Sequence, residues 1–153
     1  MALLELKNLK TFFATKRGTV KAVNGVSYSL DAGKVLGVVG ESGSGKSVSA
    51  MSILRLLDGN GYIDSGEILF NGVDLTKLSM NEMYKIRGNE ISVIFQEPMT
   101  SLNPVFTVSR QISEPLMIHQ GMTKKQAAVK AIELLSDVKI PNPEVVAKQY
   151  PHQ

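Results

Sequence analysis

The 153-residue sequence contains no cysteine and no tryptophan, and only 6% of its residues are aromatic. Without cysteine the chain can form no disulfide, no thiolate metal site and no cysteine nucleophile, which suits a reducing compartment. Surfaces that bind nucleic acid usually combine clustered basic residues with stacking aromatics. Because the 17 Lys and Arg residues are scattered along the chain, we expect no nucleic-acid partner. A few cations that face phosphates would explain the net charge of +3 equally well.

Long apolar runs are also missing. A helix that spans a membrane needs about 20 consecutive apolar residues, and no stretch of the sequence approaches that length. The amino terminus lacks the apolar segment of a signal peptide. Any work at a membrane would therefore depend on partner proteins. Hydrophobic residues still make up 43% of the chain, which is enough for the core of one ordinary domain.

Apolar segments of two kinds predict β-strands. Apolar and polar residues alternate over 3–9 and again over 26–30, as in half-buried strands joined by a hairpin loop. A short strand over Glu67–Phe70 is followed by an Asn-Gly turn. Val35–Val39 is continuously apolar, which predicts a strand buried on both faces of a parallel sheet. Ile91–Phe95 predicts a further buried strand.

Helices are predicted between and after these strands. The capping-box pattern occurs at 79–82 and at 123–126. In a capping box, the side chain before the helix bonds a backbone N–H of the first turn, and a side chain of that turn bonds back. Further helices are predicted over 47–57, over 107–119 and from Asn142-Pro143. The expected apolar face of the helix over 47–57 consists of Val48, Met51 and Leu54, and that of the helix after Thr123 consists of Ala128, Ile132, Leu135 and Val138. Antiparallel strands, then strand-loop-helix, then a helix-rich segment together predict an α/β fold.

The most informative motif is Gly40-x-x-x-x-Gly45-Lys46-Ser47, the Walker A pattern. Its glycines permit backbone angles that turn successive amide N–H groups inward around an anion. A helix that begins at Ser47 adds the positive end of its dipole at the same place. Lys46 can reach the β- and γ-phosphates of a nucleotide, and the Ser47 hydroxyl can ligate Mg²⁺.

The neighbourhood of this loop favours phosphate binding over the alternative of a flexible Gly/Ser linker, because a buried-type strand precedes it and a helix follows. The loop alone does not say which enzyme carries it, since kinases, GTPases and motor ATPases share it. The residues predicted to bind nucleotide here are Gly40, Glu41, Ser42, Gly43, Ser44, Gly45, Lys46, Ser47 and Val48.

Gln96 is a second candidate, at the end of the strand predicted over Ile91–Phe95 and before a loop broken by Pro98 and Pro104. A polar side chain at that place can meet a metal bound nearby. On these residues alone, however, the interpretation of Gln96 as a loop amide that caps the strand end is favoured.

Several stretches together resemble the ATP-binding subunit of ABC transporters, and closely the ATPases of bacterial oligopeptide and dipeptide importers. They are Ala22–Ser27, Gly37–Val48, Ile94–Pro104 and Tyr150–Gln153, in collinear order. The resemblance covers essentially the whole chain. The stretch Met-Thr-Ser-Leu-Asn-Pro that ends at Pro104 is specific to the peptide-importer type.

The resemblance implies roles for individual residues. The ligand would be MgATP, with Lys46 and Gln96 as catalytic residues and with Ser47 and Gln96 contacting Mg²⁺. Gln96 would be the Q-loop glutamine, which approaches Mg²⁺ and the attacking water and links the site to the membrane subunits. Phe13, with Phe12 as the close alternative, would stack on adenine from the first hairpin, whereas composition alone favours core packing for such a pair.

The resemblance also implies partners and a domain organisation. Residues 1–95 would form a nucleotide-binding core with an antiparallel β subdomain, and 96–153 the Q-loop and a helical subdomain that receives the permease. The partners would be a homologous ATPase subunit in a head-to-tail dimer, two membrane permease subunits and, indirectly, an external peptide-binding protein. The location would be peripheral, on the cytoplasmic face of the cell membrane.

The sequence departs from the family after Tyr150–Gln153, where the family has its signature motif, then the Walker B carboxylates and the switch histidine. Hydrolysis needs a positioned nucleophile, and this chain supplies no general base. We therefore expect the amino-terminal part of one ABC ATPase domain, truncated before the signature motif. Without that motif and the Walker B carboxylates it should be inactive on its own. It should also self-associate, because Val35–Val39 would be a strand with an open edge. The alternative is a nucleotide-binding module without turnover. A small kinase would need an acceptor site that no residue pattern suggests.

Overall fold

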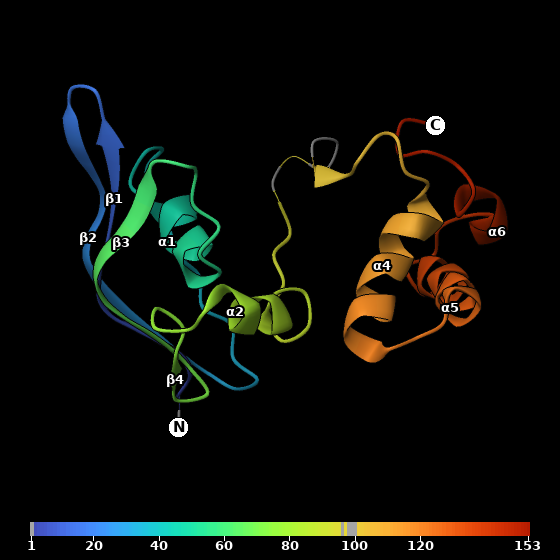
Figure 1. Cartoon of the computed structure of the whole chain (residues 1–153), viewed down its shortest axis with the longest axis horizontal. Helices are drawn as coiled ribbons and strands as arrows, with labels where there is room; N and C mark the ends of the chain where they lie inside the picture. The colour runs from blue at the N-terminus through green and yellow to red at the C-terminus, as the bar shows by residue number, and fades with distance from the viewer. Residues whose placement is uncertain (1, 96, 98–100) are drawn as a thin grey trace. The chain divides into compact units, whose positions relative to one another are not determined.

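The computed structural model describes residues 2–95, 97 and 101–153 (Figure 1). The chain divides into two compact units, Met1–Tyr84 and Lys85–Gln153. This division falls earlier in the chain than the functional boundary expected at 95/96, which stays a prediction. Each unit is described by itself below.

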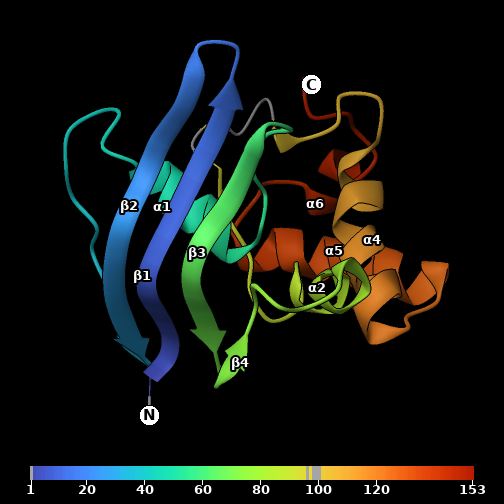
Figure 2. The same ribbon diagram turned by 60° about the vertical axis from the view of Figure 1, so that its left-hand side comes forward.

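The first unit is built on a four-stranded antiparallel sheet in the order β2-β1-β3-β4 (Figure 2). Its strands are β1 (Ala2–Thr15), β2 (Gly18–Asp31), β3 (Gly61–Phe70) and β4 (Val73–Asp74). β1 pairs with β2 and with β3 along most of its length, with bulges that shift the register. The strands predicted over 3–9, 26–30 and 67–70 are therefore confirmed, and each is longer than expected.

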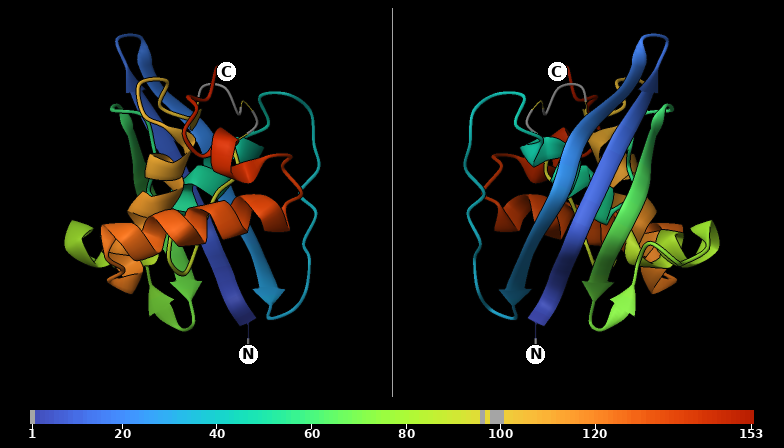
Figure 3. Two further views of the ribbon diagram at one scale, coloured as in Figure 1. Left: turned by 90° about the vertical axis from the view of Figure 1, so that its right-hand side faces the viewer. Right: turned by 90° about the vertical axis from the view of Figure 1, so that its left-hand side faces the viewer.

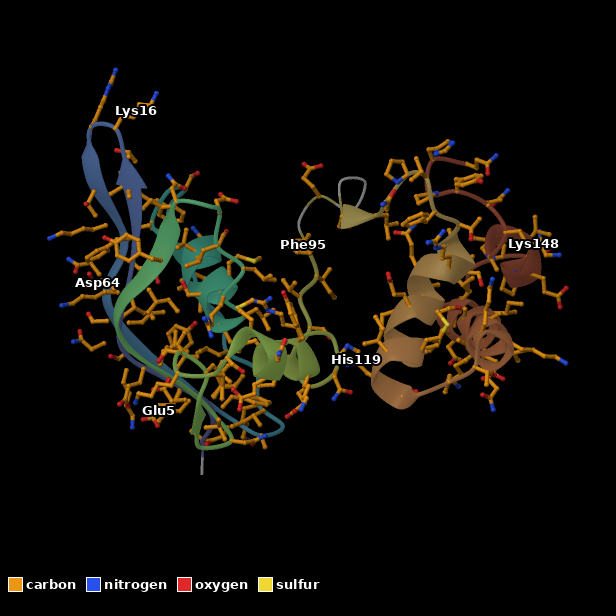
Figure 4. The ribbon with its side chains drawn as sticks, in the orientation of Figure 1. Glu5, Lys16, Asp64, Phe95, His119 and Lys148 are labelled. Carbon is orange, nitrogen blue, oxygen red and sulfur yellow. The ribbon has the colours of Figure 1, made fainter. Side chains whose placement is uncertain are left out.

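Helix α1 (Lys46–Ile53) lies against one face of this sheet, where it contacts β1 and β2 (Figure 3). The helix is shorter than the predicted 47–57. Its predicted apolar face was wrong in part: Leu54 is buried, but Val48 and Met51 are only half-buried, and the buried helical residues are Ser49 and Ser52. The fully buried apolar side chains of the unit are Leu6, Leu9, Ile68, Leu75 and Met83.

The strands predicted over Val35–Val39 and Ile91–Phe95 do not form within the described residues. Val35 is 98% exposed and Ile94 is 97% exposed, and the parallel pairing there is a single bridge between Arg87 and Ile91. The reason is physical, because a strand of a parallel core needs parallel neighbours that bury both of its faces. The described segments supply antiparallel strands and helices instead, so the α/β class stands while the parallel core is not assembled.

Helices make up the regular structure of the second unit. Helix α2 (Met80–Ile86) leads into it, and α4 (Val108–Gln120), α5 (Lys124–Asp137) and α6 (Pro143–Val146) follow. Both predicted capping boxes are confirmed: the Ser79 backbone N–H donates to the Glu82 carboxylate at 2.8 Å, and Thr123 and Gln126 cap α5 reciprocally. In the part of the chain that the structure describes, no helix combines the length and the apolar character needed to cross a membrane.

The buried face of α5 was predicted correctly in part. Leu135 is buried as expected, together with Ala127 and Ala131, whereas Ala128 and Ile132 are half-buried and Val138, which follows the helix, is 69% exposed. The buried residues follow a strict four-residue spacing, so they lie on one side of the helix. Helix α5 contacts α4 and α6.

Candidate functional site

The glycine-rich loop leads directly into the first turn of α1, and two of its glycines are required by the backbone. Gly43 and Gly45 have φ angles of 79° and 90°, in the left-handed region that favours glycine. A Cβ atom on Gly45 would also collide with the backbone carbonyl oxygen of Ala22 on β2. The loop is therefore held against the sheet at Gly45 by a contact that leaves no room for a side chain.

The Lys46 ammonium lies inside the curve of this loop. Its Nζ donates to the carbonyl oxygens of Gly40 and Glu41, both at 2.6 Å, and it lies 3.4 Å from Ser44 Oγ. These neutral acceptors hold a full positive charge at the loop centre. Phosphate oxygens would form stronger, charge-assisted hydrogen bonds with the same ammonium. A bound anion could therefore replace the two carbonyl oxygens as the acceptors of Lys46.

The amino-terminal end of α1 is open toward the loop. Gly45 is the N-cap residue, and within the described chain no side chain caps the helix there. The first-turn N–H groups of a helix have no intrahelical partner and carry a partial positive charge. Together with Lys46, they make this end of the helix suited to an anion.

The remaining loop residues predicted to bind nucleotide are accessible. Glu41, Ser42, Ser44 and Ser47 are exposed, and Val48 is half-buried. The structure therefore brings the candidates at 40–48 together along one continuous turn. Gln96, the other predicted catalytic and metal-contacting residue, lies outside the described residues.

Mg²⁺ prefers oxygen ligands and usually keeps several of its waters, so a site can rest on one or two protein groups plus substrate phosphates. The exposed Ser47 hydroxyl, one residue after Lys46, fits that requirement. Ser47 is therefore the described residue that would hold the ion.

The two neighbouring phenylalanines on β1 have different surroundings. The Phe12 ring is only 8% exposed, packs edge-on to Tyr62 at 6.3 Å between ring centroids, and has Lys21 Nζ at 5.7 Å from its centroid. Phe13 is half-buried, and its ring lies close to Gly61 and near Leu57. Phe12 is thus committed to core packing, which leaves Phe13 as the better candidate for an adenine platform; its role stays a prediction.

The sequence analysis did not identify a set of hydroxyl groups between α1 and the sheet. They are Thr11, Tyr28, Ser49 and Ser52. The one available signal was the three-residue spacing of Ser49 and Ser52, which places both side chains on the same side of a helix. Apolar periodicity passes over serine, so the sheet-facing side of α1 was assigned to its larger neighbours.

The sequence profile of the ABC transporter family matches residues 23–153. The chain belongs to this family. The oligopeptide transport ATP-binding protein OppD of Bacillus subtilis is 50% identical over 99% of the chain, and the dipeptide transport ATP-binding protein DppD of Lactococcus lactis is 50% identical over 98%. The alignments cover 42% and 43% of those two proteins, so the chain spans less than half of their length.

Solved structures agree on the fold. A bacterial ABC transporter cassette solved as a dimer superposes with a TM-score of 0.82 at 24% identity, over 98% of this chain and 62% of that one. The same cassette bound to ADP and phosphate gives a TM-score of 0.80. At this level of identity the likeness concerns the fold alone, and the fold is that of an ABC ATPase cassette, present here in part.

Proposed function

We propose that this chain binds MgATP on the loop at 40–47 as part of an ATP-binding subunit that energises peptide import. The observation that carries the proposal is the position of the Lys46 ammonium inside the loop, 2.6 Å from two backbone carbonyls, beside an uncapped helix start. The names of the similar proteins, oligopeptide and dipeptide transport ATP-binding proteins, support the transported class.

We propose a chemical role for each group of this site. The loop amides and the first turn of α1 would surround the β-phosphate, and Lys46 would neutralise charge on the β- and γ-phosphates. Ser47 would hold Mg²⁺, which when bound supplies additional positive charge at the phosphates. Gln96 would orient the attacking water, and Phe13 would stack on the base.

The complete transporter would have further parts. We propose a homologous ATPase subunit as the dimer partner, two permease subunits, and a peripheral location on the cytoplasmic face of the membrane. A dimer is supported by the dimeric cassette of the same fold. We propose ATP hydrolysis for the complete transporter only.

Calorimetric titration with MgATP tests the binding site. Lys46→Ala should weaken MgATP binding by about 1–3 kcal/mol, because one charge-assisted contact to the phosphates is lost. The matched control is Lys7→Ala, which also removes one positive charge but only from an exposed pair with Glu5 at 3.4 Å, and it should leave the affinity unchanged. Equal affinity of Lys46→Ala and the parent chain would defeat the assignment.

A further inference from the structure

A buried hydrogen bond joins the central strand to α1. Thr11 on β1 and Ser52 on α1 are both 0% exposed, and their hydroxyl oxygens are 2.8 Å apart. Ser52 Oγ also donates to the Val48 carbonyl oxygen at 2.7 Å. Because a hydroxyl group has a single proton, Thr11 must be the donor to Ser52. The relay therefore runs from the strand through Ser52 to the carbonyl group of Val48.

A second serine of α1 bonds into the same turn. The Ser49 hydroxyl, on a residue that is 5% exposed, donates to the Lys46 carbonyl oxygen at 2.8 Å, and Tyr28 on β2 lies beside Ser49. The hydrogen bonds that begin at Thr11 on the sheet thus end in the first turn of α1, where Ser49 also bonds. That turn follows the phosphate loop immediately and contains Lys46 itself.

Directional hydrogen bonds constrain the orientation of a helix on a sheet more closely than apolar packing does. A hydrogen bond weakens steeply when its angle departs from linearity, whereas apolar surfaces can slide or rotate with little change in buried area. The Thr11–Ser52 pair therefore constrains both the rotation of α1 and its position along the sheet. The position of the phosphate loop relative to the sheet is fixed with it.

Thr11 is also linked to the expected base-stacking residue. Phe13 follows Thr11 by two residues, so both side chains project toward the same side of β1. The Phe13 ring and the side chain of Leu57, which follows α1 in the chain, both lie next to Gly61, which agrees with this placement. One strand segment consequently carries both the anchor of α1 and the candidate adenine platform.

We propose that Thr11 is a positioning residue that sets the distance between the adenine platform Phe13 and the phosphate loop, acting through Ser52. The inference rests on the proposed MgATP site and deepens it. Thr11 touches no ligand in this account. It determines whether base and triphosphate can be bound at the same time by groups that belong to different elements of the fold.

The test compares MgATP with magnesium tripolyphosphate, which has the phosphates but no base. Thr11→Val keeps the shape of the side chain and removes the donor. It should lower the ratio of MgATP to tripolyphosphate affinity by about fivefold or more, since stacking on one base is worth about 1–3 kcal/mol, while tripolyphosphate affinity stays within about twofold. Thr11→Ser, which keeps the hydroxyl, should restore the ratio. Thr19→Val, at an exposed position of β2, is the matched control and should change neither affinity.

Ser52→Ala removes the acceptor instead and provides a second route if Thr11→Val does not fold; it should lower the same ratio. An unchanged ratio in a folded Thr11→Val or Ser52→Ala variant would overturn the inference, as would an equal loss of both affinities, which indicates a purely structural role. A parent chain that binds neither compound would defeat the proposed function and this inference with it. A parent chain that binds both, with variants that keep its ratio, would defeat only the inference.

Discussion

The β1–β2 hairpin and the segment Val35–Val39 are both rich in apolar residues, yet they behave differently. The hairpin strands pair from Ala2 with Asp31 to Thr15 with Gly18, across a two-residue turn. Val35–Val39 forms no strand, and Val35 and Val39 are 98% and 92% exposed. The difference is one of partners. A hairpin finds its partner next to it in the chain, whereas a strand of a parallel core needs partners brought by long connections.

This contrast divides the phosphate loop into two halves. The half that leads into α1 is anchored, because Gly45 packs against the Ala22 backbone and the Thr11–Ser52 hydrogen bond holds the helix to the sheet. The half that follows Val39 rests on a segment that is largely exposed. The anchored half contains Lys46 and the open helix start, so the groups that would bind phosphate are positioned by the sheet that does form.

The largest expected effect separates the paired strand from the unpaired segment. Leu9→Ala removes a side chain on β1 that is 0% exposed and should lower the free energy of unfolding by about 2–5 kcal/mol. Val35→Ala, in the exposed segment, should change it by less than about 0.5 kcal/mol. Chemical denaturation of the two variants provides the comparison. A loss of several kcal/mol in Val35→Ala would mean that the segment is packed in solution.

A second pair of substitutions compares the two halves of the loop region. Gly45→Ala places a Cβ against the Ala22 backbone at a positive φ, so it should destabilise the fold by about 1–3 kcal/mol and weaken MgATP binding. Gly37→Ala adds a Cβ with no described atom within 4 Å, and it should leave both properties nearly unchanged. Calorimetry and thermal unfolding measure both. Equal effects of the two substitutions would mean that the Gly45 contact does not anchor the loop.

Local signals explain which features could be predicted from the sequence. The capping pair Thr123 and Gln126 depends on residues close together in the chain and is confirmed. The loop at 40–47 is equally local in sequence, and its role in nucleotide binding stays a prediction. Features that depend on distant partners were less accessible. The choice of Ala131 over Val138 for the buried face of α5 is made by the neighbouring helix, and the role of Ser52 depends on Thr11 from another element.

The smallest expected effect concerns the Tyr28 phenol and the dependence of stability on pH. Burial raises the pKa of Tyr28 above its ordinary value of 10.0, although the hydrogen bond with Ser49 partly offsets this rise. A group whose pKa is raised by folding contributes stability below its unfolded pKa and loses that contribution as pH rises through the folded value. The parent chain should therefore lose stability above about pH 10 more steeply than Tyr28→Phe. Identical pH profiles of the two chains would contradict the burial of this phenol beneath α1.

The central claim, that the loop at 40–47 binds MgATP, is tested most directly by following backbone amide NMR signals during a titration with MgATP. The account predicts saturable shifts concentrated at the amides of 40–48, which are strongly weakened in Lys46→Ala and retained in Lys7→Ala. Shifts at these amides that do not saturate, or that are the same in Lys46→Ala and the parent chain, would contradict it.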